Sequence, residues 1–328
     1  MSTSKPKSVL LIGDPYGNQD EGMKIATSSY LKYLKKYHES EVSVSCVNSV
    51  EALEFWKRKV DYVHFCHGPS NKTLILGLIL KCLYPRARQG YSFIHPSIEA
   101  SATFLLKLLG RFDAFGPSDK YLKQLKETKA TCIDLPLGGV DVNKFDVSES
   151  LEVAALKKEL KREGKPVILH CGHLKESRNL RVLLDLVDDF SVVLIVSTST
   201  PPDLELKEEL EQGGVRVIHE YIANIADYYN ATDVYLFPVK SEHDAIALPL
   251  SVLESLACGV PVISTPFGLL QKYTPEGVGL IFTEDLSAVK LRSSYAKLSV
   301  TPRDEIRQRV KDLSWEKIVS TLVGVYLK

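Results

Sequence analysis

Positively charged side chains gather where an apolar segment ends. Residues 167–171 have the composition of a buried strand, and His173, Lys175 and Arg178 follow it at the predicted start of a helix. Cations beside a helix N-terminus oppose the helix dipole unless an anion lies between them. The pattern therefore favours a phosphate site, and solvated loop charges are the alternative.

A glycine-containing loop, residues 13–22, joins the first predicted strand to the first predicted helix and ends at Gly22. Glycines let the backbone approach a ligand closely, and a helix N-terminus attracts anions. The loop lacks the spacing of a dinucleotide-binding fingerprint, and no Gly-Lys-Ser/Thr follows it. An anion-binding loop and an ordinary turn are equally compatible with it.

One carboxylate, Glu254, stands among apolar residues in the predicted helix 250–257, which begins at Leu250. A carboxylate that is buried needs a hydrogen-bonding partner. The hydroxyls of a ribose are one such partner, and a half-exposed helix glutamate is the alternative.

Two histidines, His67 and His95, directly follow predicted strands. Open α/β sheets bind ligands at the carboxyl ends of their strands, so both histidines are candidates for a site, although either could be structural. His64, Cys66 and His67 could suggest a metal site, but successive strand residues point to opposite faces. We therefore expect no metal.

Short apolar runs alternate with longer helical patterns through the whole chain, which is typical of parallel βαβ units. The helix predicted at 23–36 and the polar helix near 151–162 are examples. The predicted strands are 8–12, 42–47, 61–66, 91–94, 114–115, 131–135, 167–171, 191–196, 215–219, 233–237, 260–264 and 279–282. This is one doubly wound α/β pattern run twice, and Gly138–Gly139 precedes a plausible boundary near residue 146.

The chain of 328 residues is long enough for two domains, and its 45% hydrophobic and 25% charged residues indicate a globular protein. Lys+Arg and Asp+Glu number 41 each, and the two halves differ by only about four charges from neutrality, so nucleic-acid binding is not expected. Six scattered cysteines indicate thiols in a reducing compartment. The first apolar run is too short for a signal peptide, so we expect a cytoplasmic protein.

Several motifs in order resemble those of the family 4 retaining glycosyltransferases, whose two Rossmann-like domains facing a cleft form the type B architecture. The segment 136–145, PLGGVDVNKF, is similar to the family's PNGVDxxxF, and 250–264, LSVLESLACGVPVIS, is nearly LEAMACGxPVIA. Gly172-His173-Leu174 with Arg178, the segment 229–238 and the final helix from 313 to 326 also match. The resemblance covers nearly the whole chain.

The resemblance implies a role for each matching residue. Glu254 would hold the donor ribose and Arg178 the diphosphate. Gly22 would lie near the phosphates, and His95 near the transferred sugar. Leu250 belongs to the same donor-binding set. The cations and helix N-termini would neutralise the leaving diphosphate without metal or other cofactor.

The chain departs from the family at three donor positions. Ile246 stands where the family keeps the first glutamate of its pair, although Glu242 and Asp244 lie just upstream. His173 replaces an arginine, so its charge depends on protonation. Ser197 begins Ser-Thr-Ser where the family has Gly-x-Gly.

These observations predict a retaining, metal-independent transfer of a sugar from a UDP or GDP sugar to a sugar, lipid-linked or small-molecule acceptor. The expected domains are an acceptor-side domain at 1–146, a nucleotide-sugar domain at 147–302 and a helix at 303–328 that packs back on the first. The alternatives are a catalytically weakened nucleotide-sugar-binding or scaffold protein and a nucleotide-sugar epimerase or hydrolase.

Two stretches, 74–88 and 104–112, combine leucines with Lys and Arg. Helices at a membrane interface have this composition, and ordinary core helices share it. The core alternative is slightly favoured, and peripheral membrane contact remains the other expectation.

Overall fold

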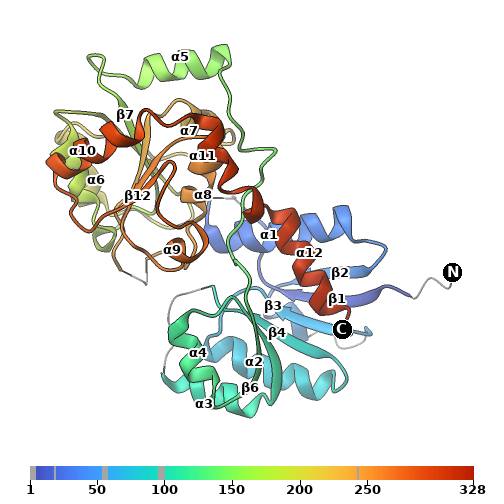
Figure 1. Ribbon diagram of the computed structural model, residues 1–328. Coiled ribbons are helices and arrows are strands. Elements are labelled where there is room, and N and C mark those ends of the chain that lie inside the picture. The colour runs from blue at the N-terminus through green and yellow to red at the C-terminus, as the bar shows by residue number, and fades with distance from the viewer. Residues whose placement is uncertain (1–4, 18–19, 54–57, 95–99, 242–243) are drawn as a thin grey trace. The chain divides into compact units, whose positions relative to one another are not determined.

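The chain forms two compact α/β units. The computed structural model describes residues 5–17, 20–53, 58–94, 100–241 and 244–328. The first unit comprises residues 1–139, 246–248 and 315–328, and the second comprises residues 140–245 and 249–314 (Figure 1). The domain bounds expected from the sequence stay a prediction.

The first unit is built on a parallel sheet in the order β2-β1-β3-β4-β5-β6. Val9 in β1, the strand next to the edge strand β2, pairs with Val44 on one side and Tyr62 on the other. The strands are β1 (Lys7–Ile12), β2 (Val42–Val47), β3 (Tyr62–Phe65), β4 (Arg88–Ser92), β5 (Arg111–Phe115) and β6 (Lys129–Ile133). Residues 9–12 are all buried, as expected for a parallel strand covered on both faces.

The helices of the first unit follow the local signals in the sequence. In α1 (Gly22–Tyr37) the buried residues Ala26, Tyr30 and Tyr33 recur at three- and four-residue spacing. The helix α2 (Asn71–Leu83) begins with a capping box, in which Ser70 and Thr73 each accept a hydrogen bond from the other's backbone N–H. The remaining helices are α3 (Ala100–Leu108) and α4 (Asp119–Leu125).

A helix that follows the second unit in sequence completes the first. The apolar face of α12 (Trp315–Tyr326) is buried, and Trp315 packs edge-on against Tyr30 at 5.7 Å between ring centroids. The hydroxyl of Tyr326 lies 2.5 Å from Nδ1 of His64 in β3. The Arg88 guanidinium donates to the carbonyl oxygen of Val325 at 3.1 Å. Strand residues therefore fix this helix by polar contacts as well as by burial.

The second unit has a parallel sheet in the order β12-β11-β10-β7-β8-β9. Its strands are β7 (Val167–Gly172), β8 (Ser191–Val196), β9 (Arg216–Ile218), β10 (Val234–Phe237), β11 (Val262–Ser264) and β12 (Leu280–Phe282). Its α-helices are α5 (Leu151–Leu160), α6 (Leu204–Gln212), α7 (Ile225–Asn230), α8 (Leu250–Ala257), α9 (Leu270–Tyr273), α10 (Ala288–Leu298) and α11 (Arg303–Gln308). Three 3₁₀ helices are η2 (Glu176–Arg178), η3 (Leu180–Leu186) and η4 (Lys311–Leu313).

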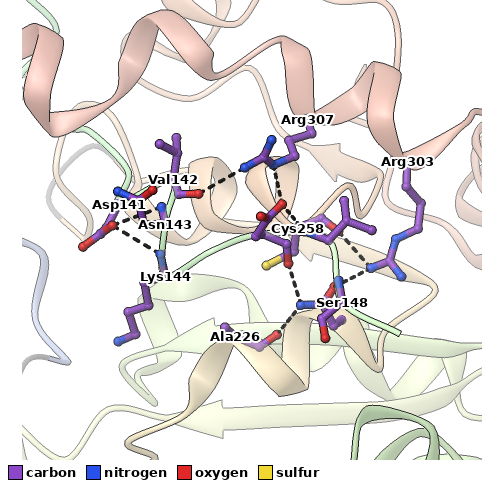
Figure 2. A network of polar contacts seen from close by, with 12 residues as sticks. Asp141, Val142, Asn143, Lys144, Ser148, Ala226, Cys258, Arg303 and Arg307 are labelled. Carbon is purple, nitrogen blue, oxygen red and sulfur yellow. Dashed lines mark hydrogen bonds and ion pairs between the residues drawn. The ribbon is translucent and has the colours of Figure 1, made fainter. Parts of the chain in front are cut away.

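Polar contacts fasten the segment 140–148 to the helices of the second unit. Figure 2 shows Arg307 of α11 donating to the carbonyl oxygen of Val142 at 3.1 Å, and its Nε lies 2.8 Å from a carboxylate oxygen of Asp146. Asn230 of α7 donates to the Asp146 carbonyl at 2.9 Å and accepts from the Ser148 N–H at 3.0 Å. Side chains of both α7 and α11 therefore hold this segment in place.

The predicted α/β fold is confirmed, with two doubly wound parallel sheets. Each of the twelve strands found in the described residues overlaps a predicted one, and the helix predicted at 23–36 is α1. The stretches 74–88 and 104–112 are only partly helical, because α2 ends at Leu83 and α3 at Leu108. The strands β4 and β5 begin about three residues earlier than predicted. Each starts with an exposed arginine, which the pattern of apolar residues does not mark as part of a strand.

Candidate functional site

In the second sheet, the order in which the strands are added reverses between β7 and β10. The chain proceeds from β7 outward to β8 and β9, then returns to the other side of β7 with β10. Ligands of open α/β sheets bind outside the carboxyl ends of the strands at such a point. Gly172 and Phe237 end these two strands, so the residues after them are the first place to look for a site.

Arg178 lies at this point with only 4% of its surface exposed. Its Nη1 donates to the carbonyl oxygen of Asp244 at 2.8 Å, while Nε has no hydrogen-bond partner among the described residues. Burial lowers the pKa of the guanidinium from its usual value. Within those residues no carboxylate lies at ion-pair distance, and the charge of the adjacent Asp244 opposes the lowering of the pKa only in part, so the positive charge is not fully compensated.

The glycine that ends β7 makes room for this arginine. A Cβ atom on Gly172 would lie 2.6 Å from Nη2 of Arg178, and the residue has φ of 156°. A side chain at residue 172 would therefore displace the guanidinium. This close approach gives a physical reason for glycine at the position.

Asp244 lies beside Arg178 and carries a second polar group without a described partner. Its Oδ1 accepts a hydrogen bond from the Ser177 hydroxyl at 2.7 Å. Its Oδ2 is buried and has no hydrogen-bond partner within the described part of the chain. The structure thus brings Arg178 and Asp244, two predicted site residues, to one place.

His173 and Ser197 follow the neighbouring strands β7 and β8. Nδ1 of His173 lies 3.0 Å from the hydroxyl of Thr200, and the Ser197 N–H donates to the Gly172 carbonyl oxygen at 3.0 Å. The α-helix predicted to start here is wrong. The 3₁₀ helices η2 and η3 follow β7, because Asn179 between them adopts a left-handed conformation with φ of 59°.

Glu254 lies on α8, where its Oε2 accepts a hydrogen bond from the Tyr229 hydroxyl at 2.9 Å. Burial raises the pKa of this carboxyl to about 7, against the opposing effects of the Tyr229 hydrogen bond and the charge of Lys144. The side chain is nevertheless partly exposed, so hydroxyl groups of a ligand could reach it. Leu250 is buried at the start of the same helix.

In the first sheet, the order in which the strands are added reverses between β1 and β3. His67 lies just after the end of β3. The Asp14 N–H donates to Nε2 of His67 at 3.4 Å, and the Thr27 hydroxyl lies 3.5 Å from the same nitrogen. A Cβ on Gly13 would lie 2.9 Å from the Thr27 methyl group. His67 therefore lies close beneath the glycine-containing loop.

Gly22 and Ile246 lie together in the first unit. A Cβ on Gly22 would approach the Ile246 side chain to 3.0 Å, and the Ala247 N–H donates to the Ile94 carbonyl oxygen at 2.8 Å. Ile246, where the resemblance predicted a departure from a glutamate, is thus a buried apolar side chain.

His95 and Glu242 lie outside the described residues, so their predicted roles stay predictions. The sequence reasoning gave no role to Tyr229, which bonds Glu254, or to Thr200, which contacts His173. An aromatic hydroxyl 25 positions from a carboxylate leaves no local signal in sequence. No helix in the described part of the chain is long and apolar enough to cross a bilayer.

Sequence comparison gives one family model and two curated relatives. Residues 165–293 match the model described as Glycosyl transferases group 1. A D-inositol 3-phosphate glycosyltransferase of Geodermatophilus obscurus is 26% identical over 211 residues, 57% of this chain, and the chain spans about half of that relative, 45%. The lipopolysaccharide core biosynthesis mannosyltransferase LpsB of Rhizobium meliloti is 25% identical over 310 residues, covering 87% of this chain and 85% of LpsB.

Structure comparison supports the architecture. Sucrose-phosphate synthase from Thermosynechococcus elongatus superposes with a TM-score of 0.74 at 14% identity, covering 98% of both chains. Anabaena HepE, crystallised with UDP and glucose, gives a TM-score of 0.72 at 13% identity, covering 97% of this chain and 99% of HepE. At these identities the likeness shows the fold, and it confirms the predicted pair of Rossmann-like units.

Proposed function

We propose that this chain, whose residues 165–293 match the model of the glycosyl transferases group 1, transfers a sugar from a nucleotide-diphosphate sugar to an acceptor, with retention of configuration and without a metal ion. The second unit binds the donor at the carboxyl ends of β7 and β10. The acceptor lies on the first unit. It is a sugar, a lipid-linked sugar or a small molecule.

The buried guanidinium of Arg178 is the observation that carries this proposal. Removing a cation from water is costly unless an opposite charge or hydrogen-bond acceptors compensate it. The Nε, which has no partner among the described residues, and the position at the end of β7 fit an anion with several acceptor oxygens, and a diphosphate is such an anion. The same charge would stabilise the diphosphate as it leaves.

Glu254 supplies the second contact. A ribose offers two hydroxyl donors, and a carboxylate accepts them more strongly than a neutral group does. His173, Ser197 and Leu250 complete the donor set, with His95 near the transferred sugar. The HepE structure contains UDP, and LpsB is named a mannosyltransferase, so UDP and GDP sugars are the first donors to test.

A nucleotide-sugar-binding protein with weakened catalysis is the second candidate. Ile246 favours it, because a buried apolar side chain replaces a carboxylate at this position. An isoleucine can neither accept a hydrogen bond from the sugar nor stabilise positive charge that develops on it.

One set of assays on the full chain separates these candidates. UDP-glucose, GDP-mannose and ADP-glucose are screened by thermal shift, because a ligand that binds only the folded state raises its apparent stability. Release of nucleoside diphosphate is then followed with and without EDTA, and the anomeric configuration of the product is read by NMR. We expect one donor class to bind and to turn over. Binding without turnover supports the second candidate, and the absence of any binding contradicts both.

A further inference from the structure

The helix α2 exposes an apolar stripe on the outside of the first unit. Ile75, Ile79 and Leu83 are 50%, 43% and 41% exposed and recur at four-residue spacing. Side chains at that spacing lie on one face of a helix. The opposite face, with Leu74, Leu76 and Leu80, is buried against the unit, so this helix is apolar on both sides.

The neighbouring helix α3 continues this surface. Phe104 and Leu108, one turn apart, are 65% and 53% exposed. The two helices pack against each other (Figure 1), and Asn71 of α2 donates to the Ser101 hydroxyl of α3 at 2.8 Å. We define the α2–α3 face by its exposed residues Ile75, Ile79, Leu83, Phe104 and Leu108.

The segment that contains α2 and α3 is basic. Residues 71–133 contain ten Lys or Arg and four Asp or Glu, a balance of +6 in a chain whose total is +0. The remaining residues therefore carry −6. Lys72, Arg86 and Arg111 are exposed on or beside the two helices, and they form no ion pair among the described residues. The segment that supplies the exposed apolar side chains thus also carries the excess of basic residues.

We propose that the α2–α3 face docks the protein on an anionic lipid surface. Basic side chains are attracted to the negative potential of such a surface, and exposed Leu, Ile and Phe side chains insert into the headgroup boundary. A second copy of this chain fits the face less well, because a symmetric dimer would bring two such basic segments together. This inference does not depend on the proposed transfer reaction.

The experiment is co-sedimentation of the full chain with vesicles. One set contains phosphatidylcholine alone, and the other contains phosphatidylcholine and phosphatidylglycerol in equal parts. We expect binding to the anionic vesicles only, weakening as salt is raised because salt screens the charges. Phe104→Ser should weaken binding by about tenfold, since it removes apolar area from the bilayer contact. Replacing both Lys72 and Arg111 by Gln should weaken it by about tenfold or more, at about fivefold per charge.

Matched controls lie on the second unit. Val289→Ser removes an apolar side chain that is 70% exposed, and Lys158→Gln removes an exposed charge. Neither should change vesicle binding. Absence of binding to the anionic vesicles overturns the proposal, as does binding that Phe104→Ser and the double variant leave unchanged. A dimer in sedimentation velocity that Phe104→Ser dissociates assigns the face to a second copy and also overturns it.

Discussion

Arg178 and Glu254 are ionisable side chains that the second unit holds in costly environments. The guanidinium is buried, with no described partner for its Nε, and the carboxyl has its pKa raised to about 7 by burial. Residues arranged for function are often suboptimal for stability. Both costs would fall when a nucleotide diphosphate binds, so these residues link affinity with stability.

Replacing Arg178 with Met should separate those two properties. The variant should lose about a hundredfold in UDP affinity, in line with two hydrogen bonds to a charged group at roughly 1.5 kcal/mol each. Its free energy of unfolding without ligand should be unchanged or higher, because an apolar side chain of similar length replaces a buried charge. Calorimetric titration and urea unfolding measure the two effects.

Arg181→Met is the matched control, because Arg181 is exposed and its guanidinium bonds Glu209 at 2.8 Å. It should leave UDP affinity unchanged. If Arg178→Met binds UDP as tightly as the parent protein does, Arg178 does not hold the diphosphate.

Glu254 predicts a pH dependence of nucleotide binding. Ribose hydroxyls favour the carboxylate, so UDP affinity should fall as the pH decreases through about 7, where the carboxyl takes up a proton. Glu254→Gln should bind about tenfold more weakly at about pH 8 and show no such decrease. Titrations with UDP between about pH 6 and about pH 8 test this, since an unchanged slope in the variant removes Glu254 from the ribose contact.

The same carboxyl affects stability with the opposite sign. Its folded pKa lies above the ordinary value of 4.5, so the folded state binds more protons between about 4.5 and about 7. The contribution of this carboxyl to the free energy of unfolding therefore falls as pH rises through that window. Without ligand, Glu254→Gln should be more stable than the parent by about 2 kcal/mol at about pH 8, a figure reduced for partial solvent access, and equal to it at about pH 4. Equal stability at both pH values would contradict this assignment.

At the scale of elements, the end of β7 decides where Arg178 lies. Gly172 leaves the space that the guanidinium occupies, and Asn179 ends η2 in a left-handed conformation. The chain after this strand therefore turns twice within a few residues. A regular α-helix after β7 would place Arg178 away from the end of the strand. The 3₁₀ turn instead places it next to Gly172.

Gly172→Ala should displace Arg178, because the new Cβ would lie 2.6 Å from its Nη2. We expect UDP affinity to fall by about tenfold, as for the loss of one hydrogen bond to a charged group. Gly164→Ala is the control, since Gly164 also has a positive φ of 73° but a Cβ there would meet no atom within 4 Å. The control should lose about 1 kcal/mol of stability and no affinity. Equal affinities in the two variants would exclude this role for Gly172.

The strands and the long helices could be predicted from the sequence because buried parallel strands are continuous apolar runs and α1 repeats its apolar residues regularly. The 3₁₀ helices after β7 could not, because they depend on the conformation of Asn179. The candidate residues were found through motif spacing. Motif spacing could not predict the Tyr229–Glu254 hydrogen bond, or that the Nε of Arg178 has no partner among the described residues. Both depend on how separate elements pack.

At the scale of the molecule, each unit has a buried, neutral histidine in its sheet. His64 in the first unit and His170 in the second are 0% exposed, and burial lowers the pKa of each imidazole to about 3. Nearby positive charge adds to the effect, from His67 and from Arg178 respectively. The unfolded chain binds these protons near the ordinary value of about 6.5.

These two histidines should therefore destabilise both units in acid. Between about 6.5 and about 3 the unfolded state binds more protons at them, so their contribution to the free energy of unfolding falls as the pH decreases. Each histidine should contribute about 2 kcal/mol of loss by about pH 5. Urea unfolding at several pH values measures the slope, which His64→Gln and His170→Gln should each reduce by about one proton. His219→Gln, at an exposed position, should leave it unchanged, and equal slopes in all variants would contradict the prediction.

The place of α12 in the sequence has a consequence for synthesis on the ribosome. Domains generally fold in order as the chain emerges, with the N-terminal one first. Here Trp315 and Tyr326 belong to the core of the first unit but are translated after the whole of the second unit. Until they emerge, the partner of His64 and the packing surface of α1 are missing. The first unit is thus translated first but finishes folding last. While the second unit is being translated, the incomplete core of the first unit remains accessible to chaperones.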